Sequence, residues 1–98
     1  MPYYVVSSVD IFDADKHAAY SSDGTPAVAR HRGRFVVKGG KPQALEGNWQ
    51  PDRMTIVEFP TAEDAKAFYE SPEYQAARLK RLGACDFKLV LVGSGSES

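Results

Sequence analysis

The sequence has 98 residues, of which 43% are apolar and 26% are charged, enough for one modest hydrophobic core but not for two. Twelve Lys and Arg residues against thirteen Asp and Glu residues give a net charge of -1, which argues against nucleic acid as a partner. The single cysteine, Cys85, excludes an internal disulfide and fits a reducing compartment, so we expect a cytoplasmic protein.

The first third of the chain predicts a strand followed by a helix. Residues 3–9 are rich in aromatic and β-branched residues, which favour a strand. Asp13 can cap a helix that extends to Arg32. We expect this helix to break and to restart at Pro26, because proline is tolerated at a first helical position, and we expect Gly33 to end it.

The middle third predicts two strands joined by a long loop. Residues 34–38 and 53–59 place β-branched or aromatic residues at alternate positions, as strands do. The segment 39–52 between them is long for a hairpin connection, and such loops are usually functional or anchored by their own side chains. We expect Leu45 and Trp49 to anchor it and an extra edge strand to form near residues 43–46.

The last third predicts two helices and a strand. Thr61 caps the first helix, and Ser71-Pro72 ends it and opens a shorter one that stops at Gly83. The shorter helix is expected to turn Tyr74, Ala77 and Leu82 inward. Residues 87–92 form the last strand, so residues 1–93 are expected to be one domain and residues 94–98 a flexible tail.

The order of elements is typical of an α+β fold of the ferredoxin-like, split β-α-β type. Two β-α-β halves of similar pattern predict a four-stranded antiparallel sheet with both long helices on one side. The other side also carries apolar residues, because Met54 and Ile56 alternate with Val57 and Phe59 in one strand. An antiparallel sheet with two apolar faces needs two covers, and a second copy of the chain is the simplest second cover.

Several short motifs resemble an uncharacterised bacterial family, the domain of unknown function thirteen-thirty, in the dimeric α+β barrel superfamily. The resemblance covers nearly the whole chain. The motifs are Tyr20, Gly33 to Phe35, Gly39-Gly40, Leu45-Glu46-Gly47, Arg53, Glu58-Phe59-Pro60, and the run from Phe68 through Tyr69 and Ser71-Pro72-Glu73-Tyr74 to Gly83.

The resemblance implies a homodimer whose two sheets enclose a barrel-like space, and it implies no established activity. Related superfamily members include cofactor-independent oxygenases, lactone isomerases and haem-degrading enzymes, which is an analogy of fold only. The haem-degrading members use a suitably placed Asn, Trp and His, and Asn48 and Trp49 lie in the wrong element to match them. We expect no cofactor.

Glu58 is the most prominent candidate for chemistry, because it shares the expected dimer-facing side of its strand with Met54 and Ile56. Antiparallel pairing around the long loop places it opposite Arg34 and on the same face as Lys38. A carboxylate there is either a general base with a raised pKa or one half of a structural ion pair, and buried charges are generally paired whatever their role.

The other ligand-binding candidates each have a structural alternative. Arg53 can bind a substrate carboxylate or form a rim salt bridge with Asp52 or Glu46. His31 at a helix end favours the charged form, and it is too far along the helix from His17 for the two to share a metal ion, so we expect no metal site. Four tyrosines can line a pocket or fill the core: Tyr4, Tyr20, Tyr69 and Tyr74.

Three hypotheses follow for function. The first is a small-molecule site, belonging to a binding protein or an enzyme that uses Glu58 with Arg34 or Arg53 and a tyrosine. The second is a non-catalytic interaction module in which the loop 39–52 contacts another protein. The third is that Glu58 and its basic neighbours only hold the dimer together. None involves a membrane, since the sequence has neither a signal-peptide pattern nor a stretch of membrane-spanning length.

Overall fold

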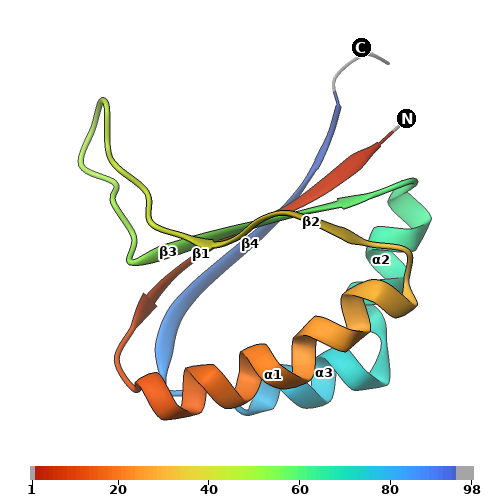
Figure 1. Ribbon diagram of the computed structural model, residues 1–98, viewed down its shortest axis with the longest axis horizontal. Helices are drawn as coiled ribbons and strands as arrows, with labels where there is room; N and C mark the ends of the chain where they lie inside the picture. The colour runs from red at the N-terminus through yellow and green to blue at the C-terminus, as the bar shows by residue number, and fades with distance from the viewer. Residues whose placement is uncertain (1, 95–98) are drawn as a thin grey trace.

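The computed structural model describes residues 2–94, apart from the side chain of Asp23, and forms a sheet with helices on one side only (Figure 1). The expected flexible tail therefore lies outside the described residues except for Ser94. The strands are β1 (Tyr3–Ile11), β2 (Arg34–Gly40), β3 (Arg53–Phe59) and β4 (Cys85–Gly93). The helices are α1 (Ala14–Arg30), α2 (Ala62–Glu70) and α3 (Pro72–Leu79).

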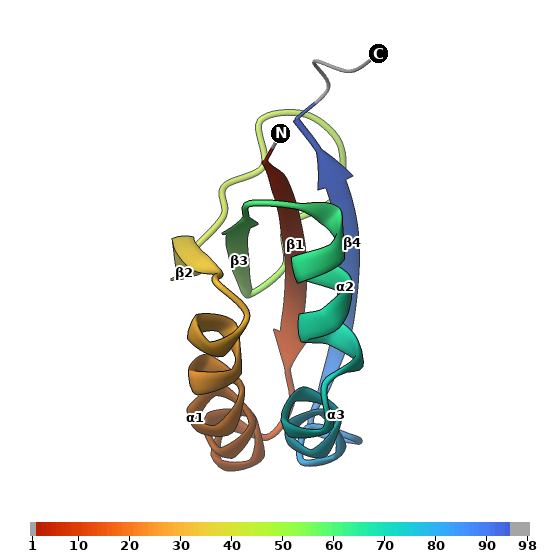
Figure 2. The same ribbon diagram turned by 90° about the vertical axis from the view of Figure 1, so that its right-hand side faces the viewer.

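The sheet is antiparallel throughout, with strand order β2-β3-β1-β4. This is the predicted split β-α-β arrangement, and all three helices cover the same face, as Figure 2 shows from the side. The buried core lies between the two layers. Its residues are Val5, Ala27, Val28, Val57, Phe59, Ala65, Phe68 and Tyr74. No helix within residues 2–94 is long and apolar enough to cross a membrane.

The helix α1 differs from its prediction, because it is continuous and contains Pro26 in its interior. Asp13 caps it as expected, accepting a hydrogen bond from the Lys16 N–H at 3.2 Å. Directly before the proline, which interrupts the hydrogen-bond ladder, Thr25 donates its hydroxyl to the Ser21 carbonyl at 2.8 Å. The following Ala27 and Val28 are buried in the core, so tertiary packing holds the helix together across the proline.

The end of α1 also differs in detail. Arg32, not Gly33, adopts the left-handed conformation, with φ 67°, and the Gly33 N–H bonds back to the Val28 carbonyl at 2.8 Å. Gly33 is required for another reason, since a Cβ there would lie 2.7 Å from the Phe59 ring. The strain at Arg32 is offset by its side chain, which pairs with Asp64 at 2.7 Å.

The helices α2 and α3 are capped as predicted by Thr61 and Ser71, whose hydroxyls accept from backbone N–H groups three residues on. Tyr74 and Ala77 point inward as expected. The prediction for Leu82 was wrong: α3 ends at Leu79, the following residues form a turn, and Leu82 is exposed while Ala84 is buried.

The loop between β2 and β3 contains no strand, so the expected edge strand at residues 43–46 is absent from this described segment. Leu45 and Trp49 do not anchor the loop within the chain, since they are 91% and 59% exposed. The loop is instead fixed at its end, where Asp52 accepts from the Ile11 N–H at 2.8 Å and its own N–H donates to Asp10 at 3.1 Å. In Figure 1 it projects on the side of the sheet away from the helices.

The pairing of β2 with β3 shifts register twice, and the first shift, a bulge between Phe35 and Val37, changes which way Lys38 points. Arg34 pairs with Glu58 as predicted, but the register shifts after Phe35, so that Val37 pairs with Ile56. The extra residue moves Lys38 to the helix-covered side, where its Nζ lies 4.8 Å from the Phe35 ring centroid. The expectation that Lys38 shares a face with Glu58 was therefore wrong, because strict alternation does not survive a bulge.

Candidate functional site

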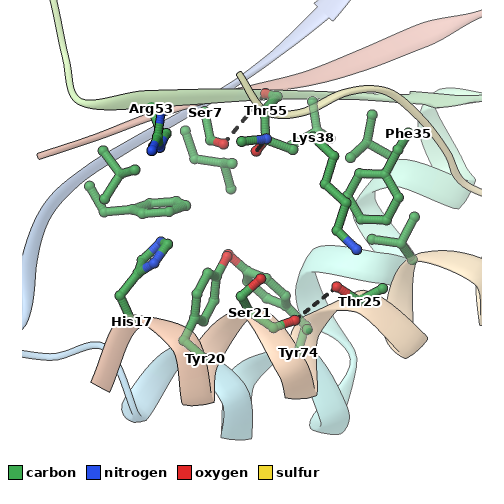
Figure 3. A pocket seen from close by; sticks show the side chains of 18 of the residues that line it. Ser7, His17, Tyr20, Ser21, Thr25, Phe35, Lys38, Arg53, Thr55 and Tyr74 are labelled. Atoms are coloured by element: carbon green, nitrogen blue, oxygen red, sulfur yellow. Dashed lines mark hydrogen bonds between the residues drawn. The ribbon is translucent and has the colours of Figure 1, made fainter. Parts of the chain in front are cut away.

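A cavity of about 320 Å³ lies between α1 and the covered face of the sheet (Figure 3). Its size is within the range of small-molecule sites. The sheet side is formed mainly by apolar residues of β1, β3 and β4, and the helix side by one face of α1 with one residue each from α2 and α3. The polar residues that line it are Ser7, His17, Tyr20, Ser21, Thr25, Lys38, Arg53, Thr55 and Tyr74.

Two cations enter the cavity from the sheet. Arg53 begins β3 and Lys38 follows the bulge of β2, and Figure 3 shows them on either side of Thr55. The lining residues include no Asp or Glu, and none of the ion pairs between described residues involves either cation. The rim salt bridge of Arg53 with Asp52 or Glu46, the alternative open from the sequence, is therefore not formed. Two cations without an ion pair among the described residues, of which Arg53 is half-buried and Lys38 exposed, favour an anion beside this apolar wall.

The helix side contributes His17 and Tyr20, one turn apart on α1, with ring centroids 6.0 Å apart. Burial, and then the nearby Arg81 cation, lower the pKa of His17, so its imidazole is neutral at pH 7 and can accept a proton. Burial, followed by Tyr74, raises the pKa of Tyr20, which therefore stays a neutral hydroxyl. The site thus places a base and a hydrogen-bond donor opposite two cations.

Behind the cavity, Tyr20 and Tyr74 are linked to a buried arginine. Their hydroxyl oxygens are 3.2 Å apart, and Arg81 Nη1 donates to the Tyr74 hydroxyl at 3.2 Å. The Arg81 guanidinium carbon lies 3.8 Å from the Phe87 ring centroid and 4.7 Å from that of Tyr20. Aromatic faces therefore surround a cation that is only 8% exposed.

Glu58 and Arg34 lie on the other face of the sheet and do not reach the cavity. Arg34 donates from Nε and Nη2 to Glu58 Oε1 at 3.1 and 2.6 Å, and the Tyr4 hydroxyl donates to Oε2 at 3.1 Å. Arg34 first, and then Tyr4, hold the pKa of Glu58 below its ordinary value. This is the geometry of the ion pair, and it is the reverse of the raised pKa that a general base would need.

Two further candidates lie elsewhere. Tyr69 is 40% exposed and forms part of a separate hollow between α2 and β4. His31 meets Phe68 edge to face at 6.4 Å between ring centroids, with Nε2 3.7 Å from Glu73 Oε2. The cavity therefore brings together Tyr20, Lys38 and Arg53 of the residues proposed from sequence, and separates them from Arg34, Glu58, Tyr69 and His31.

The residues missed by sequence reasoning are mostly small and polar. Ser7 and Thr55 lie on adjacent strands of the covered face, where the pattern of β1 interrupts its apolar side with a serine. His17 was considered only as a metal ligand paired with His31. A serine at an inward position was the available signal, although its hydroxyl is also satisfied within the chain, donating to the Thr55 carbonyl at 3.4 Å. Within residues 2–94 no group of three or more His, Cys, Asp or Glu side chains is placed to hold a metal ion.

The strand order and one-sided helices define a ferredoxin-like α+β domain. The family model described as domain of unknown function (DUF1330) matches residues 2–94, so the chain belongs to this family. No curated protein matches the sequence significantly.

Solved structures share the fold at low sequence identity. A protein of unknown function from Rhodopseudomonas palustris is 24% identical, with a TM-score of 0.75 over 93% of this chain and 80% of that one. A dimeric ferredoxin-like protein of unknown function from Jannaschia sp. CCS1 is 12% identical, with a TM-score of 0.75 over 95% of this chain and 99% of that one. SnoaB, a cofactor-independent oxygenase from Streptomyces nogalater, is 11% identical, with a TM-score of 0.61 over 95% and 92%.

Proposed function

We propose that the chain binds a small organic anion in the cavity between α1 and the sheet. The observation that carries this proposal is the pair of cations, Arg53 and Lys38, that line the cavity without any carboxylate among the lining residues. Arg53 is half-buried, so it loses part of its hydration and gains no ion pair unless a ligand supplies the anion, whereas Lys38 is exposed, stays hydrated and adds positive charge at the opening.

The walls indicate what kind of anion fits. Apolar side chains of the sheet, with Phe35, Phe68 and Phe87, form most of the lining, which suits a flat or cyclic hydrocarbon body. Arg53 can bind a carboxylate through two parallel N–H groups, while Lys38 provides a point charge on the far side of Thr55. The proposed ligand is therefore an aromatic or cyclic organic acid.

The proposal includes catalysis through His17. Of the lining residues it alone combines a neutral, proton-accepting nitrogen with a pKa lowered by burial. SnoaB, described as a cofactor-independent oxygenase, shows that a fold of this kind can host catalysis, whereas the role of His17 is proposed from its place in the cavity alone. Glu58, the base considered from the sequence, has no part in the proposed chemistry.

The test uses 4-isopropylbenzoate as the probe, a carboxylate with an apolar body. We expect saturable binding by isothermal titration calorimetry, weakened about 10–100-fold by Arg53→Gln, since hydrogen bonds to charged groups contribute about 1.5–3 kcal/mol. Lys38→Gln should weaken binding by a smaller factor.

Arg34→Gln is the matched control, because it removes a cation from the opposite face of the same sheet. Its affinity for the probe should stay within about twofold of wild type. Equal losses in Arg34→Gln and Arg53→Gln would show that only overall charge matters and would contradict the proposed site.

We further propose that two copies pair through the uncovered face of the sheet. That face carries Met54, Ile56, Val90 and Val92, with the Arg34–Glu58 pair at its edge, and none of the helices α1, α2 and α3 lies over it (Figure 1). The proteins from Jannaschia sp. CCS1 and Bacteroides fragilis are described as dimeric, which supports the same arrangement here. Sedimentation of Ile56→Lys should show a monomer, and an unchanged dimer would contradict this interface.

A second candidate function, a protein-interaction module, rests on the loop between β2 and β3. Leu45 and Trp49 are its exposed apolar side chains and could contact another protein. Iodide quenching of Trp49 fluorescence in the purified protein separates the cases. Strong quenching favours a free docking loop, whereas weak quenching favours a loop already packed in the dimer.

A further inference from the structure

Arg81 is a buried cation without a carboxylate. None of the ion pairs between described residues involves it, although it is only 8% exposed, and its one hydrogen bond to a side chain goes to the Tyr74 hydroxyl at 3.2 Å. Three aromatic rings surround it, those of Phe87, Tyr20 and Tyr74. Burying a charge in this way is costly, and packing alone would be served better by methionine or leucine.

The hydrogen bond to Arg81 fixes the direction of the bonds beyond it. A guanidinium can only donate, so the Tyr74 oxygen accepts from Arg81. Tyr74 and Tyr20 then share one hydroxyl contact, at 3.2 Å, but have two hydroxyl protons. Neither hydroxyl makes a further hydrogen bond with the side chains and backbone described in residues 2–94, so one proton is left without a partner among them.

The remaining proton belongs to Tyr20 when all the bonds point the same way. Arg81 donates to Tyr74, Tyr74 donates to Tyr20, and each bond polarises the next, which strengthens the last donor. Tyr20 lines the cavity, and Figure 3 shows its side chain rising from α1 into the space below the sheet.

We infer that Arg81 and Tyr74 orient the Tyr20 hydroxyl as a hydrogen-bond donor to a second oxygen of the ligand, so that the cavity selects organic acids that also carry a carbonyl group. This inference rests on the proposed function and narrows its ligand class. The carboxylate binds at the sheet side, with Arg53 and Lys38, and the carbonyl oxygen accepts from Tyr20 on the helix side. Arg81 and Tyr74 are positioning residues in this scheme.

The experiment compares two probes of similar shape, 4-acetylbenzoate and 4-isopropylbenzoate, of which only the first has a carbonyl. Their dissociation constants are measured for wild type and for Tyr20→Phe, which removes the donor and keeps the ring. We expect Tyr20→Phe to lower the preference for the acetyl probe about 3–10-fold, the value of one neutral hydrogen bond, while affinity for the isopropyl probe changes little. Tyr69→Phe is the control, because it removes a hydroxyl outside the cavity, and its preference should match wild type.

The positioning role of Tyr74 and Arg81 is tested by the same ratio of the two probes' dissociation constants. Tyr74→Phe should lower the preference by a smaller factor than Tyr20→Phe, because the Tyr20 hydroxyl remains but is no longer oriented. Arg81→Met should do the same, and Arg81→Lys, which still donates, should restore part of it. General damage to the cavity would weaken both probes together and leave the ratio unchanged.

The outcomes separate the two proposals. If both probes bind wild type and their ratio is unchanged in Tyr20→Phe, the hydrogen-bond chain is overturned and the anion site stands. If neither probe binds wild type, the proposed function fails and this inference fails with it.

Discussion

The two faces of the sheet differ in whether their charged side chains are paired. On the open face Arg34, Glu58 and Tyr4 satisfy one another at 2.6–3.1 Å. On the covered face Arg53 and Lys38 enter a cavity that has no carboxylate among its described lining residues. A cluster whose charges are paired needs no ligand to explain it, whereas cations without an ion pair are what the proposed anion would bind. The difference leads us to assign Glu58, the more prominent charged residue in the sequence, to the structure, and to propose the less prominent Arg53 and Lys38 as ligand contacts.

The largest expected effect is a loss of stability on the covered face, because its residues pack against the helices of the same chain. Phe59→Ala removes a fully buried ring between sheet and helices and should lower the free energy of unfolding by about 3–5 kcal/mol in urea denaturation. Ile56→Ala, on the open face of the same strand, should mainly raise the monomer fraction in sedimentation. If Ile56→Ala costs as much as Phe59→Ala without changing assembly, the open face is part of the chain's own core.

A smaller effect on stability should distinguish the packed part of the covered face, at Gly33, from the cavity, at Gly24. Gly33→Ala places a Cβ 2.7 Å from the Phe59 ring and should cost about 1–3 kcal/mol by overpacking. Gly24→Ala, inside α1, meets nothing closer than the Tyr20 ring at 3.9 Å and should stabilise the protein by about 0.5–1 kcal/mol. Thermal denaturation of both variants gives the comparison, and destabilisation by Gly24→Ala would mean that the cavity is not open there.

The cluster of Arg34, Glu58 and Tyr4 on the open face should make stability depend on pH in the acid range. Since the folded pKa of Glu58 is depressed, its contribution is present above the unfolded value of about 4.3 and is lost as pH falls through the folded pKa. Urea midpoints between pH 2.5 and 6 should therefore fall more steeply for wild type than for Glu58→Gln. Parallel curves would show that the ion pair does not contribute to stability.

His17 on the covered face should make stability depend on pH nearer to neutrality, and this is the weakest of the expected effects. The folded pKa of His17 is lowered, so below about pH 6.5 the unfolded chain binds a proton that the folded chain does not. Stability therefore decreases as pH falls from 6.5 towards the folded pKa. His17→Gln should remove this slope between pH 5 and 7 without changing the acid-range slope set by Glu58, and an unchanged slope would place His17 in water.

The sequence was sufficient for the architecture and for part of the site. Alternation, caps and the split β-α-β order predicted all four strands, the one-sided helices and the pairing of Arg34 with Glu58, because these follow from local patterns and simple topology. Pro26 misled the prediction of α1, since core packing overrides its local effect.

The cavity itself was not predictable from local pattern. It depends on the separation between α1 and the sheet, which is set by contacts between distant segments, such as Phe68 and Tyr74 against β1 and β3. His17, Lys38 and Arg53 come from three elements and meet only in the folded chain. The bulge in β2 leaves no signal in the sequence beyond an otherwise ordinary run of valines.

That bulge affects how relatives of this chain should be compared. A relative that lacks one residue between the positions of Arg34 and Lys38 would restore regular alternation and still keep the two cations on opposite faces. A relative of equal length with an unbroken strand would instead turn its lysine away from the cavity and present a valine. Alignment columns through β2 are therefore a poor guide to which chains bind the same ligand, and gap placement at this one position deserves to be decided by structure.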